Sequence, residues 1–70
     1  MNKENPKKYT LQLSTYEAVS KYSADENVSF RQSSFTIYSN FRRNRIKCGF
    51  NLKSQDQFYN SLKRFKSLKL

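Results

Sequence analysis

The chain has 70 residues, enough for one small domain with a thin hydrophobic core. One glycine, one cysteine and no histidine exclude a glycine-rich phosphate loop, an intramolecular disulfide and an ordinary zinc site, and we do not expect an enzyme. The net charge is +9, and the whole excess lies in residues 27–70, where there are ten basic residues and one acidic residue. Such an excess attracts polyanions.

The ends of the chain and its compartment follow from composition. Residues 1–7 are polar and charged after the first methionine, which predicts a disordered tail before a single basic domain over residues 8–70. No apolar run is long enough for a signal peptide or a membrane span. A single cysteine, Cys48, cannot form an intramolecular disulfide, which fits a reducing compartment. We expect Cys48 to be a small buried hydrophobic residue. We therefore expect an intracellular protein, either cytoplasmic or associated with the nucleoid or nucleus, with no cofactor and no small-molecule substrate.

The first elements are a strand and a short helix. Apolar and polar residues alternate over residues 9–14, the pattern of a half-buried strand. Ser14 and Glu17 have the spacing of a capping box, and the apolar residues that follow recur at helical spacing. A short helix is therefore expected over residues 15–23, ended by a turn at residues 24–27.

The middle of the chain reads as further strands. Alternation returns over residues 28–30 and again over residues 35–37, but the parity changes between them. A strand exchanges its buried face only through a turn or a bulge, which we place at Ser33 and Ser34.

A basic bend and a regular strand come next. Residues 40–44 have asparagine at both ends and two arginines inside, which predicts the bend of a hairpin. Apolar residues then alternate strictly with other residues over 46–53, and this is the clearest strand pattern in the chain.

The last element is an amphipathic helix over residues 55–68. Ser54 and Gln57 have the spacing of a capping box, and Asp56 in the first turn suits the positive end of a helix. The apolar residues then follow at positions i, i+4 and i+7, namely Phe58, Leu62 and Phe65.

Together these elements predict an α+β fold: a small sheet of three to four strands, a short helix near the N-terminus, and a C-terminal amphipathic helix packed on one face. The helical stripe should contact Ile46, Phe50 and Leu52. The alternative is a winged helix, with a second helix around residues 28–38 and a wing over 40–53. The β-branched and aromatic residues of 35–38 favour the sheet.

The basic cluster is the strongest functional signal. Arginine forks match phosphate oxygens, and so few acids accompany the cations that an ordinary solvated surface is the weaker reading. Tyr38 and Phe41 lie beside the arginines and either pack in the core or stack on unpaired bases. The predicted nucleic-acid-binding residues are Arg31, Arg42, Arg43, Arg45, Lys47, Lys53, Lys63, Arg64 and Lys66.

These residues predict a non-enzymatic protein that binds the phosphate backbone of DNA or RNA through an arginine-rich hairpin and a basic helix face. The alternative is a protein-interaction module, encoded by a phage, virus or plasmid, that docks on an acidic protein partner. Binding to an anionic membrane surface is disfavoured, because the C-terminal helix needs its apolar stripe for the core.

Short fragments carry two resemblances. One set resembles pieces of small excisionase-type DNA-binding proteins, which implies a winged helix that bends DNA for recombination: Tyr9-Thr10-Leu11, Glu17-Ala18, Ser20-Lys21-Tyr22 and Asn44-Arg45-Ile46. The spacing between Ile46 and Phe58 departs from that pattern. Separately, the layout of residues 35–68 is similar to that of very small basic ribosomal proteins. Neither resemblance assigns a role to a residue.

Overall fold

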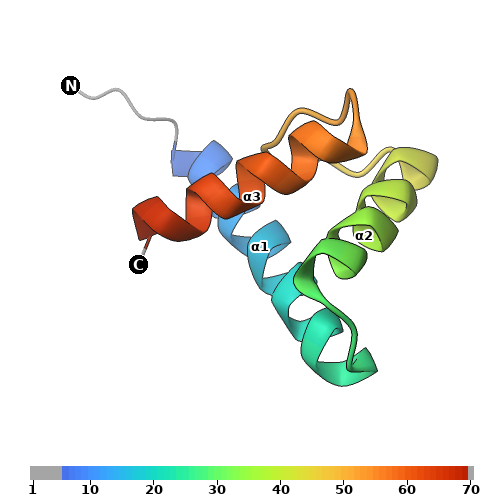
Figure 1. The fold of residues 1–70 in the computed structure, drawn as a ribbon. Helices are drawn as coiled ribbons and strands as arrows, with labels where there is room; N and C mark the ends of the chain where they lie inside the picture. Colours follow the sequence, from blue (N-terminus) through green and yellow to red (C-terminus); the bar gives the residue numbers. More distant parts are fainter. Residues whose placement is uncertain (1–5, 70) are drawn as a thin grey trace.

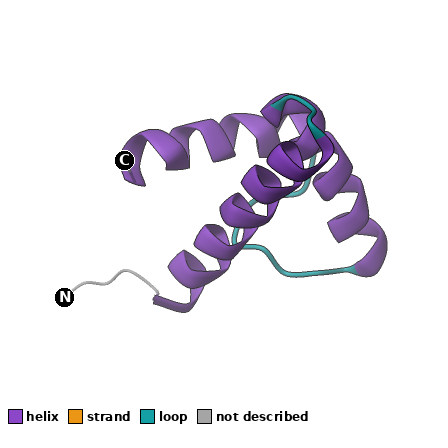
Figure 2. Ribbon diagram, turned by 90° about the horizontal axis from the view of Figure 1, so that it is seen from below, coloured by secondary structure: helices purple, strands orange, loops and turns teal. Residues whose placement is uncertain are grey.

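The protein is built from three helices. The computed structural model describes residues 6–69, which form α1 (Pro6–Glu26), α2 (Phe30–Asn44) and α3 (Gln55–Lys69). α1 and α2 form a V that is closed at the turn between them, and α3 crosses its open end (Figure 1). Within residues 6–69 there is no strand (Figure 2). The predicted α+β fold is therefore wrong.

α1 extends through two predicted elements. It begins at Pro6, where the fixed backbone angle of proline suits the first position of a helix. It then continues through the predicted strand at 9–14 and includes the predicted helix at 15–23. Asn27 adopts a left-handed conformation with φ of 55°, and the Val28 N–H closes the helix end by donating to the Ser23 carbonyl at 3.2 Å. Of the predicted tail, residues 1–5 lie outside the described residues.

α2 replaces the predicted strands of the middle segment. Its N-cap is Ser29, whose hydroxyl accepts a hydrogen bond from the Gln32 N–H at 3.0 Å. At the other end Arg45 is left-handed, and the Ile46 N–H donates to the Phe41 carbonyl at 2.9 Å. The winged-helix alternative predicted a helix over part of this segment. Its wing at 40–53 is the end of α2 and a loop, so that alternative is also wrong.

Two serines explain why the sequence predicts a turn in the middle of α2. Ser33 and Ser34 are fully buried, at 0% exposure, where a turn had been predicted. Their hydroxyls donate to carbonyls of the same segment, those of Ser29 at 2.9 Å and Arg31 at 2.7 Å. A buried serine whose hydroxyl donates to a nearby backbone carbonyl leaves no unpaired polar atom. Its side chain is also small enough to lie between packed helices.

The predicted strand at 46–53 lies in the loop between α2 and α3. This loop passes α1, and side chains of α1 satisfy its carbonyls in place of a partner strand. Gln12 Nε2 donates to the Gly49 carbonyl at 3.0 Å, and Thr15 Oγ1 lies 3.1 Å from the Cys48 carbonyl and 2.8 Å from that of Leu11. The strand prediction for 46–53 is therefore wrong: the segment bends at Gly49, Phe50 and Lys53, and carbonyls of this loop are satisfied without a sheet.

Gly49 allows the loop to approach α1 closely. Its φ is 79°, a conformation that side chains with a Cβ rarely adopt. A Cβ at this position would lie 2.7 Å from Gln12 Cγ and 2.9 Å from the Lys8 carbonyl oxygen. The single glycine of the chain thus stands where no other residue fits without moving α1.

α3 was predicted correctly and supplies much of the core. The Ser54 hydroxyl caps it by accepting from the Gln57 N–H at 3.1 Å. The stripe of Phe58, Leu62 and Phe65 is buried, together with Val19, Tyr38 and Cys48 from the rest of the chain.

The predicted partners of the α3 stripe are partly correct. The Phe50 ring meets those of Phe58 and Phe65 edge-on at 6.0 and 5.9 Å, and Leu52 packs at the margin of the core. Ile46 is 40% exposed, so its predicted place in the core is wrong. Cys48 is buried as predicted, and burial raises the pKa of its thiol, which favours the neutral form.

Candidate nucleic-acid interface

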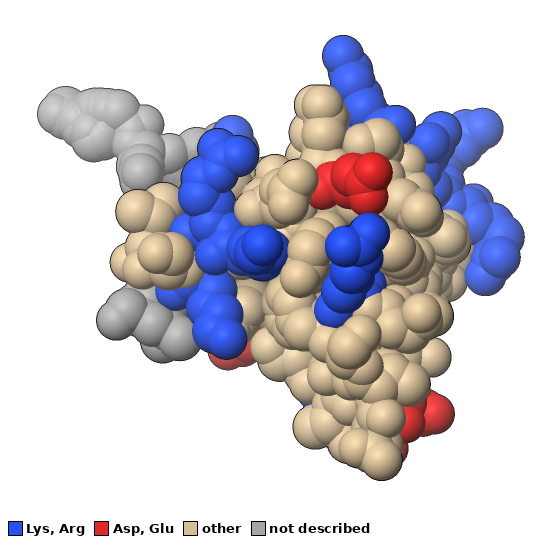
Figure 3. Space-filling view, viewed as in Figure 1, with Lys and Arg blue, Asp and Glu red and all other residues tan. Residues whose placement is uncertain are grey.

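All nine predicted cations are exposed. On the face shown in Figure 3, Lys and Arg side chains gather over the end of α2 and the following loop, over the later part of α3 and the start of α1, and at one place between these groups. Few acidic side chains appear on this face. The basic surface therefore has two ends and a centre, and it is formed mainly by α2, α3 and the loop that joins them.

These cations are not neutralised by carboxylates. The single salt bridge among residues 6–69 is on α1, where Lys21 Nζ lies 3.0 Å from Asp25 Oδ2. Within the same residues, no carboxylate is within salt-bridge distance of any of the nine cations. An external anion would therefore meet little competition from the protein's own carboxylates for these cations.

The predicted arginine-rich hairpin is the C-terminal end of α2. Arg42 and Arg43 lie in its last turn, where the negative end of the helix dipole favours cations. Arg42 Nη1 donates to the Tyr38 hydroxyl at 3.1 Å, and that hydroxyl donates to the Leu52 carbonyl at 3.1 Å. The Arg42 guanidinium is thus held in place by a contact that also ties the loop to α2.

Arg45 follows Arg43 in an uncommon backbone conformation. Its φ of 55° and ψ of 44° are left-handed, a region that glycine enters without steric cost and arginine does not. The side chain is exposed, so no packing contact explains an arginine here.

A second group joins α2 and α3, which the sequence had not connected. The Arg31 guanidinium carbon lies 5.5 Å from the centre of the Tyr59 ring and 5.2 Å from that of Phe35. Lys63 Nζ lies 5.2 Å from the centre of the same Tyr59 ring. One tyrosine therefore gathers a cation from each helix by cation–π contact.

The pattern of charges in the sequence does not by itself indicate Tyr59. The spacing of Tyr59 and Lys63 places both on one face of the predicted C-terminal helix, which was a usable signal. The contribution of Arg31 depended on the pairing of α2 with α3 and had no local signal.

The two aromatic residues proposed for base stacking belong to the core. Tyr38 is 8% exposed and stacks obliquely on Phe58 at 5.7 Å, and Phe41 packs against the buried cluster. Tyr38 therefore offers no free ring face of the size that a base needs, and Phe41 is partly buried against the core.

The remaining predicted cations lie at the margins of this surface. Lys47 and Lys53 extend from the loop after α2, and Arg64 and Lys66 from the exposed side of α3. Arg64 also borders a cavity between α3, the loop and α1.

No protein-family model, curated protein or solved structure gives a significant match to this chain. None of the described helices is both long enough and apolar enough to cross a membrane.

Proposed function

We propose that the protein is a non-enzymatic, intracellular nucleic-acid-binding protein that contacts phosphates of DNA or RNA through the basic surface of α2, α3 and their loop. The observation that carries this proposal is the meeting of Arg31 and Lys63 around Tyr59, with no carboxylate among the described residues to neutralise them. Bringing like charges together raises the energy of the free protein, and a bound phosphate would lower it.

The distribution of the other cations supports a polymer as the ligand. Basic groups lie at both ends of the face in Figure 3 and between them, whereas a single small anion would need only one cluster. Successive phosphates of a nucleic-acid strand present repeated negative charges at regular intervals. Arg42 and Arg43 at the end of α2 would hold one part of the strand, and the Arg31 and Lys63 pair the next.

The test is the salt dependence of binding. Affinity for duplex DNA and RNA should fall steeply with salt, because each neutralised phosphate releases counterions. The double substitution Arg31→Ala with Lys63→Ala should flatten the slope of log K against log salt by about 2 units on duplex DNA. Loss of affinity should be similar for unrelated sequences, since phosphate contacts carry no sequence information.

The matched control is Lys21→Ala. Lys21 is also an exposed cation, but it lies on α1 and is paired with Asp25. Its removal should leave the salt slope unchanged. A wild-type protein with no affinity for any nucleic acid, but with affinity for an acidic protein partner, would reject this proposal in favour of the protein-interaction alternative.

A further inference from the structure

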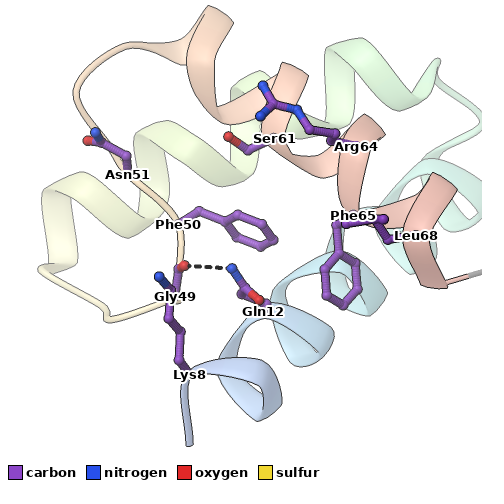
Figure 4. A pocket seen from close by; sticks show the side chains of 9 residues that line it. All are labelled: Lys8, Gln12, Gly49, Phe50, Asn51, Ser61, Arg64, Phe65 and Leu68. Carbon is purple, nitrogen blue, oxygen red and sulfur yellow. Dashed lines mark hydrogen bonds between the residues drawn. The ribbon is translucent and has the colours of Figure 1, made fainter. Parts of the chain in front are cut away.

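A groove runs between the start of α1, the loop after α2, and α3 (Figure 4). It comprises two cavities of about 280 and 310 Å³ that share Asn51, Ser61 and Arg64. Ligand pockets usually occupy about 300–1,000 Å³, so the two cavities lie at the lower limit of that range and suit a ligand no larger than one small ring system.

Two cations border the first cavity from opposite sides. Lys8 comes from α1 and Arg64 from α3, with the cavity between them in Figure 4. None of the described residues that line either cavity is Asp or Glu. An anionic group at either edge would therefore find a cation without competition from a carboxylate.

The interior of the first cavity is aromatic. The Phe50 and Phe65 rings line it and meet edge-on at 5.9 Å. Phe50 is only partly buried, so it keeps some ring surface open toward the groove. Flat heteroaromatic rings stack on such surfaces without regard to sequence.

Amide side chains with unused hydrogen-bonding capacity complete the groove. Asn51 Oδ1 accepts from the Lys53 N–H at 3.0 Å, which leaves the amide NH₂ of Asn51 free to donate. Within residues 6–69, the side chains of Gln57 and Asn60 make no hydrogen bond, although both line the second cavity. Asn and Gln amides recognise base edges by paired hydrogen bonds.

We infer that this groove takes an unpaired base of single-stranded nucleic acid, with the flanking phosphates held by Lys8 and Arg64. The inference rests on the proposed function and adds a preference for unpaired strands. The base stacks on Phe50, and its edge faces Asn51. A duplex binds only the outer basic surface, because its bases are already paired and stacked.

The experiment compares a single-stranded DNA of about 12 nucleotides with its duplex, by fluorescence anisotropy at one salt concentration. The variant Ser61→Leu places a larger side chain in both cavities, and Ser67→Leu makes the same change at an exposed position of α3 outside them. Ser61→Leu should weaken single-strand binding about tenfold, as expected for loss of one stacked base, and should leave duplex binding unchanged. Ser67→Leu should change neither.

A second variant, Asn51→Ala, removes the amide without filling the groove and should weaken single-strand binding selectively in the same way. Unchanged single-strand affinity in correctly melting Ser61→Leu and Asn51→Ala proteins would overturn the groove, while duplex binding by the wild type would preserve the proposed function. Equal weakening of single-strand and duplex binding would also overturn it. Absence of binding to both nucleic acids would overturn the proposed function and the groove together.

Discussion

The two ends of the basic surface differ in how far the fold depends on their cations. At the end of α2, the Arg42 guanidinium hydrogen-bonds to the Tyr38 hydroxyl, which also holds the Leu52 carbonyl, and the backbone of Arg45 ends the helix. On α3, Lys63 rests on the Tyr59 ring, and neither the Lys63 nor the Arg64 side chain makes a hydrogen bond within residues 6–69.

The two ends therefore suggest different roles for their cations, one in folding and binding together and one in binding alone. Cations at the end of α2 favour the native loop as well as attracting anions, so their removal should affect both folding and binding. Cations on α3 contribute little to the native structure, since exposed charges are worth little to stability. We therefore expect their removal to affect binding more than folding.

The largest expected effect comes from detaching α3 from the core. Leu62 is fully buried, at 0% exposure, and Leu62→Asp would place an unpaired charge there. We expect the free energy of unfolding to fall by about 4 kcal/mol or more, which is enough to unfold a domain of this size. Binding that depends on the folded surface should then be lost at both of its ends. Thermal melting followed by circular dichroism measures this, with Ser67→Asp on the exposed side of α3 as the control. A normal cooperative melt for Leu62→Asp would contradict the helical core.

The next effect concerns the charges at the end of α2. Replacing Arg42, Arg43 and Arg45 together by Ala should reduce the salt slope on duplex DNA by about 2–3 units, one for each lost phosphate contact. The melting temperature should also fall, because the guanidinium contact with Tyr38 is lost. The triple variant Lys63→Ala, Arg64→Ala and Lys66→Ala should change the slope similarly without lowering the melting temperature. Equal melting temperatures for the two triple variants would remove the distinction between the ends.

A smaller effect is expected from one hydroxyl. Tyr38→Phe removes the group that connects Arg42 to the Leu52 carbonyl and should destabilise the protein by about 1 kcal/mol. Tyr59→Phe is the matched control, since the Tyr59 hydroxyl makes no hydrogen bond within the described residues and its ring is retained. Chemical denaturation of both variants measures the difference. A Tyr38→Phe protein as stable as Tyr59→Phe would show that the contact does not hold the loop.

The smallest effect has opposite signs for stability and binding. Arg45→Gly relieves a left-handed arginine and should stabilise the protein by about 0.5–1 kcal/mol. The same change removes one phosphate-binding cation, so duplex affinity should fall and the salt slope should decrease by about 1 unit. Denaturation and anisotropy on one protein sample test both. A destabilised variant, or one that binds DNA more tightly, would contradict this account of Arg45.

The C-terminal helix could be predicted because its local signals agree with its surroundings. Ser54 caps it as its spacing indicated, and Phe58, Leu62 and Phe65 form one buried stripe. The apolar residues that recur at helical spacing are also the ones buried in the core, so the periodicity predicted both the helix and its buried side.

α2 was missed because its buried face contains small polar residues. Ser33 and Ser34 count as polar in a pattern of hydrophobic residues and as turn formers by propensity, although both are buried and satisfied on their own helix. A local signal was present, since Ser29 and Gln32 have capping-box spacing.

The loop at 46–53 was predicted as a strand for a different reason. Its alternation corresponds to burial only in part, because Cys48 is buried whereas Ile46 is exposed. Its hydrogen-bond partners are side chains of α1 such as Gln12 and Thr15. Periodicity reports which side of an extended segment is buried. It does not report whether the neighbour is a strand.

The candidate site was predictable as a set of charges but not as an arrangement. The nine cations that the sequence marked are all exposed, yet the meeting of Arg31 with Lys63 depends on how α2 packs against α3. The groove, with Lys8 from one helix and Arg64 from another, depends on the same tertiary packing.

The central claim is that duplex phosphates bind the surface of α2, α3 and their loop rather than the part of α1 around Lys21 and Asp25. The most direct test is to map the contact by amide chemical shifts during titration with a short DNA duplex at low salt. We predict that the largest shifts occur around Arg31, at the end of α2 and along the exposed side of α3, and that residues around the Lys21 and Asp25 pair on α1 remain unchanged. Shifts concentrated around Lys21 and Asp25, or an absence of shifts at saturating DNA, would contradict the claim.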